Sequence, residues 1–238
     1  MSYDKHSYYA TKLLQKDALA DKIRVIRDSR LFCDLDGAAI RSFIEQSYIF
    51  SCPKGENILK QGQPVEHYYM ILAGRMKIFN ESGSGKKFII DIYHAGEPFY
   101  LAPLFSGNPS SASSKAMEDS LILRMEKTIF FDFLLNHSLS ALRFIEMFSS
   151  RSIYMILRTR DCLIDKANDR LLFTLQLLNR RFGNSLKFTL FEIAELSSTT
   201  TETAIRFMHM LKKEGLASVT RGKISIEDNR KLQEFILT

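Results

Sequence analysis

The stretch Thr189–Gly215 constrains the fold of this 238-residue chain more than any other segment. Both of its halves repeat apolar residues at helical spacing. These residues are Ile193, Ala194 and Leu196 in the first half, and Ala204, Phe207, Met208 and Leu211 in the second. Between the halves lies Ser197–Thr200, made of residues that favour helix N-caps. The stretch therefore predicts a helix-turn-helix, whose second helix enters the DNA major groove.

The flanking sequence extends this motif to a winged form. Before it, a leucine stripe predicts a helix that ends near Gly183, which is placed for a C-cap. After it, Ala217–Ile226 predicts a hairpin with Arg-Gly-Lys at its turn. A winged helix-turn-helix is thus expected at the C-terminus.

Between Ser47 and Glu126 the pattern changes to short β-runs separated by glycine and proline. The expected strands are Tyr48–Cys52, Asn57–Lys60, Tyr68–Leu72, Arg75–Phe79, Phe88–Tyr93, Ser113–Met117 and Ser120–Arg124. Ser82–Gly85 is expected to form a hairpin tip. Many short strands at regular spacing favour a sandwich, roll or barrel.

Helical patterns flank this β region. They cover residues 1–46, a short apolar helix up to Asn136, and a long helix from about Ser138 to Asp165. The long helix carries a narrow seam at 3–4 spacing, formed by Leu142, Ile145, Ser149, Ser152, Ile156, Thr159 and Leu163. Such a seam is typical of a dimerisation helix. Packing against the β region explains it equally well, and the sequence leaves both interpretations open.

Composition narrows the class of protein. A net charge of +6 and a pI near 9.2 suit a polyanionic partner such as DNA. The three cysteines, Cys33, Cys52 and Cys162, are too scattered for a disulfide framework or a zinc finger. No signal peptide, membrane span or familiar catalytic motif is evident. We therefore expect a soluble cytoplasmic protein that is not an enzyme.

The order of these parts resembles the Crp/Fnr family of bacterial transcription regulators. The segments that carry the resemblance are Pro53–Glu56 with Gly62-Gln63, Met70–Phe79, Lys166–Leu172 and Glu192–Arg206. The resemblance implies an α+β fold. Its parts are an N-terminal β-roll, like the jelly roll of cyclic-nucleotide-binding domains, over 1–136, a central dimerisation helix over 137–166 and the winged helix-turn-helix over 167–238. It also implies a homodimer on double-stranded DNA at a palindromic promoter site, with RNA polymerase as a further partner.

In this family the second helix of the motif carries a Glu and an Arg four residues apart, which here are Glu202 and Arg206. Both side chains then lie on one helix face and can reach one groove. Arg can bond guanine and Glu can accept from cytosine, although a solvent-facing ion pair would also explain the spacing. Thr201 stands where many members have a second base-contacting Arg, and Ser198 stands where they often have Gly.

Further residues are candidates for phosphate contacts. They are Thr189, Thr199, Thr200 and Thr203 of the motif, and Arg221 and Lys223 of the wing. Helix capping or plain solvation explains any single one of them as well.

The expected ligand segment of the roll runs from Gly96 to Ser114. In a gapless comparison, Leu101 takes the place of the family's ribose-binding Glu, and Ser110-Ser111 that of its phosphate-binding Arg-Ser. Losing that Arg would cost a cyclic phosphate about 1.5–3 kcal/mol. The positions that would meet a purine are the apolar Met155 and Ile156. Cyclic AMP is therefore disfavoured.

Other effectors stay open. Phe99 and Tyr100, with Met155 and Ile156, would suit an apolar or aromatic effector or an ordinary core. His94 and His67 are candidates for a haem ligand. Three scattered cysteines do not suffice for an iron–sulfur cluster, but a thiol redox switch remains open. We expect a DNA-binding regulator that couples an effector or redox signal to promoter binding. The alternative is a cyclic-nucleotide module that acts through protein contacts.

Overall fold

The computed structural model describes residues 24–81, 87–164 and 166–235. The chain forms two compact units, one of residues 1–80 with 90–150 and the other of residues 81–89 with 151–238. Expected features in residues 1–23 and at Ser82–Gly85 lie outside the described residues. Within the described ranges, none of the helices combines the length and the apolar character that a membrane crossing requires.

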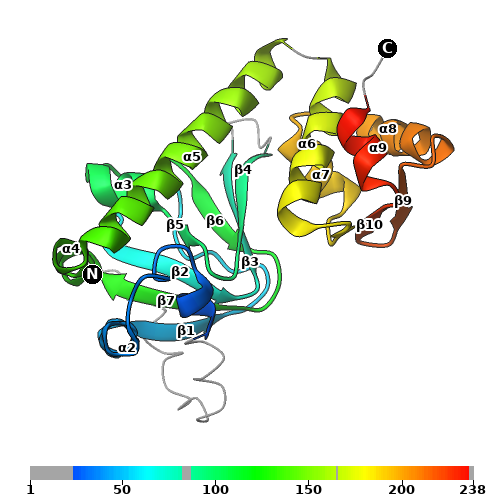
Figure 1. Cartoon of the computed structure of the whole chain (residues 1–238). Helices are drawn as coiled ribbons and strands as arrows, with labels where there is room; N and C mark the ends of the chain where they lie inside the picture. Colours follow the sequence, from blue (N-terminus) through cyan, green and yellow to red (C-terminus); the bar gives the residue numbers. More distant parts are fainter. Residues whose placement is uncertain (1–23, 82–86, 165, 236–238) are drawn as a thin grey trace. The chain divides into compact units, whose positions relative to one another are not determined.

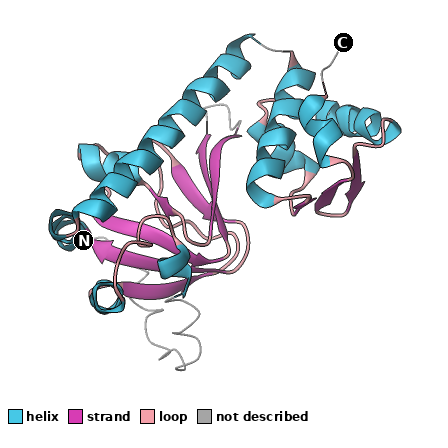
Figure 2. Cartoon of the chain, in the orientation of Figure 1, coloured by secondary structure: helices cyan, strands magenta, loops and turns pink. Residues whose placement is uncertain are grey.

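Antiparallel strands form the β-roll (Figures 1 and 2). One sheet has the order β1-β7-β2-β5, with β1 at Tyr48–Cys52, β7 at Ser120–Glu126, β2 at His67–Ala73 and β5 at Pro98–Phe99. The other has the order β4-β3-β6, with β4 at Lys87–His94, β3 at Arg75–Glu81 and β6 at Ser113–Ala116. These strands confirm the β-run pattern, apart from one segment.

The segment 57–60 is not a strand, so the strand predicted there is wrong. The backbone N–H groups of Ile58 and Leu59 donate to the Ser114 hydroxyl, at 3.2 and 3.1 Å. A side chain therefore takes the donors that a neighbouring strand would otherwise accept. The sequence analysis also did not predict β5 or α3 (Leu101–Ser106).

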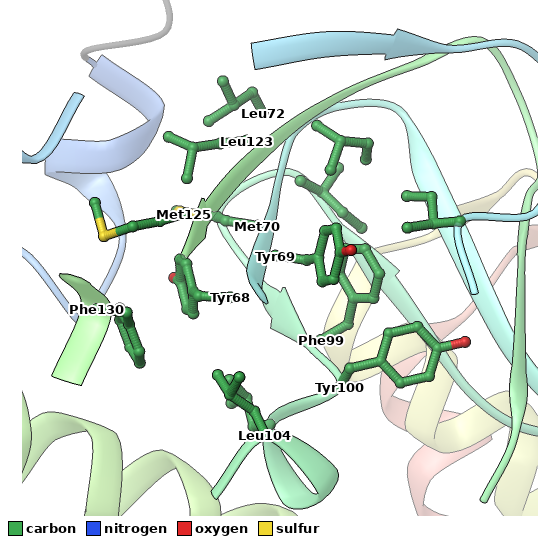
Figure 3. Packing of buried hydrophobic residues seen from close by; sticks show 14 of the residues in the cluster. Tyr68, Tyr69, Met70, Leu72, Phe99, Tyr100, Leu104, Leu123, Met125 and Phe130 are labelled. Atoms are coloured by element: carbon green, nitrogen blue, oxygen red, sulfur yellow. The ribbon is translucent and has the colours of Figure 1, made fainter. Parts of the chain in front are cut away.

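An aromatic cluster fills the roll beside α2 (Gly37–Glu45) and α4 (Lys127–Asn136). The rings of Tyr68 and Phe130 stack with centroids 4.1 Å apart (Figure 3). The ring centroids of Phe43 and Phe133 lie 4.9 Å apart. Complete burial raises the pKa of Tyr68, whose hydroxyl has no hydrogen-bond partner among the described residues. This core fixes the strand ends from which the ligand segment starts.

The long helix α5 spans Ser138–Ile164, close to the predicted bounds. Ser140 and Phe144 are its buried residues in the first half, and the Phe144 ring lies 5.5 Å from that of Phe130. The predicted seam lies on another face, with Leu142, Ile145 and Ile156 more than half exposed. The seam is therefore not the face that packs on the roll.

The C-terminal unit has the predicted winged form. Its helices are α6 (Ala167–Phe182), α7 (Leu190–Leu196), α8 (Thr201–Lys213) and α9 (Asn229–Glu234). Its sheet has the order β8-β10-β9, with β8 at Ser185–Leu186, β10 at Lys223–Ile226 and β9 at Ala217–Thr220. Gly183 is the C-cap of α6 with a φ of 76°, as predicted.

Candidate nucleic-acid interface

Threonine caps define where the two helices of the motif begin. The Thr189 hydroxyl accepts from the backbone N–H of Glu192 (3.2 Å), and the Glu192 carboxylate accepts from that of Thr189 (2.8 Å). The Thr200 hydroxyl accepts from the Thr203 N–H at the start of α8 (3.3 Å). Thr189 and Thr200 are thus the N-caps of α7 and α8, and Thr203 supplies the backbone N–H that the Thr200 hydroxyl accepts.

The face of α8 opposite its core is polar and charged. Ala204, Phe207, Met208 and Leu211 are buried, whereas Glu202 and Arg206 are exposed and Thr201 is half-buried. Arg206 Nη2 donates to the Thr203 hydroxyl (3.1 Å). The pKa of Glu202 is lowered by hydrogen bonds from its own backbone N–H and from the Thr200 hydroxyl, and by the charge of Arg206. The Glu202 carboxylate is therefore ionised at neutral pH, and both side chains are accessible.

The wing presents two cations beside an apolar anchor. Arg221 and Lys223 are exposed at the turn between β9 and β10, while Ile224 and Ile226 are buried. Exposed cations on a fixed hairpin can approach phosphates without further ordering of the backbone.

The remaining candidate for a phosphate contact, Thr199, lies in the turn between α7 and α8, where its N–H donates to the Ala194 carbonyl (3.0 Å).

The first helix of this unit, α6, holds the turn of the motif. Arg170 Nε donates to the Ser197 carbonyl (2.9 Å), and Nη2 donates to the Ser198 carbonyl (3.1 Å). The Ser197 hydroxyl donates to the Thr174 hydroxyl oxygen (2.9 Å) in the core. The sequence analysis gave Arg170 and Thr174 no role, because helical periodicity does not show which carbonyls a side chain meets.

In the ligand segment of the roll, Tyr100 occupies the interior. Its backbone is left-handed, with a φ of 59°, and its side chain is buried. The hydroxyl shares its proton between the carbonyls of Leu59 (3.3 Å) and Ala112 (3.2 Å). The Ser110 hydroxyl donates to the same Ala112 carbonyl (2.6 Å). Burial raises the pKa of Tyr100, so the phenol stays neutral.

The other effector candidates divide between core and surface. Phe99 and Leu101 are buried with Tyr100, and Figure 3 shows the Phe99 ring beside the Tyr100 ring. Ser111 is exposed. On α5, Met155 is half-buried and Ile156 is exposed. The structure thus brings together Phe99, Tyr100, Leu101 and Ser110 among the buried residues of the roll.

The candidate redox cysteines differ in burial and in their contacts. Cys33 is exposed and donates to the Arg30 carbonyl (3.4 Å). Burial, and then the Glu56 carboxylate, raise the pKa of the Cys52 thiol to about 11, which disfavours its thiolate. The side chain of Cys162 lies outside the described residues.

Both histidines of the roll have neighbours. His94 Nδ1 lies 2.9 Å from the Ala95 carbonyl, and Nε2 lies 3.5 Å from the Glu97 carboxylate. The ring of His67 lies 6.1 Å from that of Tyr69. Among the described side chains, no group of three His, Cys, Asp or Glu residues could hold a metal ion.

Two domain models match the chain. The model of the cyclic nucleotide-binding domain matches residues 49–137, and that of the Crp-like helix-turn-helix domain matches residues 169–235. The chain is 25% identical over 189 residues to the cyclic AMP receptor protein of Thermus thermophilus, over 77% of this chain and 85% of the relative. It is 24% identical over 192 residues to electron transport regulator A of Shewanella oneidensis, over 75% and 74%. The solved structure of FixK2 from Bradyrhizobium japonicum matches with a TM-score of 0.71 and 17% identity, over 81% of this chain and 98% of that one.

A β-roll joined to a winged helix-turn-helix, together with these matches, defines a DNA-binding transcription regulator. The chain belongs to the Crp/Fnr family. The predicted family, the α+β fold class and the class of function are thereby confirmed.

Proposed function

We propose that this chain regulates transcription as a homodimer on a palindromic promoter site, in which α8 of each protomer enters the major groove of its own half-site. The observation that carries the proposal is the pair of faces on α8. One face is buried in the winged unit, and the other exposes the ionised Glu202 one helical turn from Arg206. A helix held rigidly on one side and polar on the other has the geometry required to read base edges.

Residue roles follow from this docking. Arg206 would donate to guanine, and Glu202 would accept from cytosine, with Thr201 as a neighbouring base contact. The phosphate contacts would come from Thr189, Thr199, Thr200 and Thr203 in the motif and from Arg221 and Lys223 in the wing. Arg206 must then exchange its hydrogen bond with the Thr203 hydroxyl for a bond with the base. This exchange costs little because the existing hydrogen bond is exposed to solvent.

The homodimer is supported by exposed apolar side chains on α5, three of which belong to the predicted seam. The exposed side chains, 41–67% accessible, are those of the seam residues Leu142, Ile145 and Ile156 and of their neighbours Leu139, Phe148 and Ile153. An apolar stripe of this length is typical of a protein interface. Replacing Leu142 and Ile145 by Glu should yield monomers in light scattering and weaken binding to a two-fold site. A matched control is Leu135→Glu, because Leu135 is even more exposed, at 82%, but lies on α4.

We also infer that the roll takes no cyclic nucleotide. The relative from Thermus thermophilus carries cyclic AMP in its name, so this ligand is the first to test. Here the Tyr100 ring is buried in the ligand segment, and its hydroxyl donates to the Ala112 carbonyl that also accepts from the Ser110 hydroxyl. No arginine is available at Ser110-Ser111 for the phosphate. Calorimetric titration of the full chain with cyclic AMP and cyclic GMP should give no binding heat, and micromolar binding of either would contradict this inference.

The experiment that tests the main proposal is selection of genomic DNA fragments by the purified chain. We expect an enriched motif with two inverted half-sites and a retarded band in gel shifts. Binding that shows no sequence preference would overturn the proposal and favour a module acting through protein contacts. A matched surface control is Arg230→Ala in α9, which removes the same charge outside α8 and the wing.

Three further expectations accompany this function. RNA polymerase is the expected partner at the promoter, and the cytoplasm is the expected location, because the target is chromosomal DNA. The chain is proposed to have no catalytic activity. The proposed domain division is residues 1–136 for the sensor, 137–166 for the dimerisation helix and 167–238 for DNA binding.

A further inference from the structure

The turn between α7 and α8 contains a residue in a costly backbone conformation. Ser198 has a φ of 51°, in the left-handed region. Residues with a Cβ enter this region at a cost, whereas glycine enters it freely. The turn also positions Thr200, whose hydroxyl caps α8. The direction in which α8 starts therefore depends on a conformation that Ser198 does not favour.

Contacts from α6 oppose this tendency. The Arg170 guanidinium donates to the two consecutive carbonyls of Ser197 and Ser198, at 2.9 and 3.1 Å. The Ser197 side chain, 1% exposed, is bonded to the Thr174 hydroxyl one helical turn further along α6. A planar guanidinium fits two adjacent carbonyls because its donors have a fixed fork geometry. The turn is thus held at its carbonyls and at its buried hydroxyl.

We propose that Arg170 is a positioning residue for DNA recognition, which holds the strained Ser198 turn so that α8 is presented in its DNA-binding orientation, with Thr174 as its helper. The proposal rests on the function proposed above. Arg170 acts through the turn and makes no base contact. Without it, the turn relaxes part of the time, and the apparent affinity falls by the fraction of molecules that keep the competent conformation.

The strain supplies a specific test, because glycine at position 198 removes the need for a clamp. We would measure DNA affinity by fluorescence anisotropy on the selected site for four full-length proteins: wild type, Arg170→Ala, Ser198→Gly and the double variant. In the wild-type background, Arg170→Ala should weaken binding about tenfold, the scale of one lost charged hydrogen bond. In the Ser198→Gly background, the same change should weaken binding about threefold or less. Arg170→Lys, which keeps the charge but lacks the fork, should fall between wild type and Arg170→Ala.

The salt dependence of binding separates positioning from a phosphate contact. A positioning residue leaves the slope of affinity against salt unchanged, whereas loss of a phosphate contact lowers the slope by about one. The control is Arg180→Ala, because Arg180 lies on the same helix but donates to Gln233 in the α9 region (2.6 Å). Wild-type affinity is expected for this control.

Amide hydrogen exchange tests the clamp without DNA, so that failure of the clamp and failure of the proposed function can be told apart. The Thr199 N–H, bonded to the Ala194 carbonyl, should exchange faster in Arg170→Ala and return towards wild-type protection in the double variant. Equal losses of affinity in the wild-type and Ser198→Gly backgrounds, or a reduced salt slope, would overturn the proposal. Unchanged exchange in Arg170→Ala would overturn it even if the wild-type chain showed no selective DNA binding.

Discussion

Replacing Tyr100 by Gly and by Ala separates its two unusual properties, a buried ring and a left-handed backbone. Both changes remove a ring that is 7% exposed and lies 5.4 Å from Phe99, which costs about 3–5 kcal/mol of unfolding free energy. Only glycine also relieves the left-handed backbone, by about 1–2 kcal/mol. We therefore expect a loss of about 1–4 kcal/mol for Tyr100→Gly and a loss larger by about 1–2 kcal/mol for Tyr100→Ala.

Urea unfolding followed by circular dichroism measures this order. The order is informative because glycine is normally the less stable of the two substitutions in regular structure. Tyr100→Phe is the matched control, since it keeps ring and backbone and loses only the hydroxyl that donates to Leu59 and Ala112, about 1 kcal/mol. A Gly variant less stable than the Ala variant would refute the left-handed backbone. A Gly variant as stable as wild type would refute the stabilising burial of the Tyr100 ring.

Three further predictions concern stability. Gly74→Ala should lower the thermal midpoint more than Gly62→Ala. Both glycines have a φ near +85°, but only at Gly74 would the new Cβ lie 2.8 Å from the Ser120 Cα. Equal shifts of the midpoint would contradict this packing. The raised pKa of Tyr68 keeps its phenol neutral in the native state, while this group ionises in the unfolded chain above about pH 10. Tyr68 should therefore lower the unfolding free energy by about 1.4 kcal/mol per pH unit there, and Tyr68→Phe should reduce the measured slope by that amount, while the contribution of the buried Tyr100 remains. Thr189→Ala should lower stability by about 1 kcal/mol by loss of the capping box, whereas Thr189→Ser should restore most of it; no difference between the two would count against the cap.

Much of the fold was predictable because its local signals agree with its tertiary packing. The apolar spacing of Thr189–Gly215 predicts α7 and α8, and the structure buries the same residues. Gly183 ends α6 where a C-cap was expected. The long helix α5 also follows from periodicity, although its partner does not, because one seam can face a roll or a second chain. Its exposure within the chain leaves the second chain as the better interpretation.

The errors and omissions arise where side chains from distant segments set the backbone. At Ile58 the donors of an apparent strand go to Ser114, 56 residues away, and no local pattern shows this. The contacts of Arg170 with the turn carbonyls span 27 and 28 residues. Tyr100 was a candidate for an effector pocket or for an ordinary core, and the structure buries its ring and satisfies its hydroxyl in the interior. Predicting that outcome from sequence would require knowing that its backbone is left-handed.

The most direct test of the central claim is a base-pair scan of the selected site with Arg206→Ala and Lys223→Ala. If α8 reads bases and the wing binds phosphates, Arg206→Ala should cost about 1–3 kcal/mol and lose its preference at one base pair of each half-site. Lys223→Ala should weaken binding to every sequence alike and lower the salt slope by about one. An Arg206→Ala protein that keeps the full wild-type base preference would contradict the account.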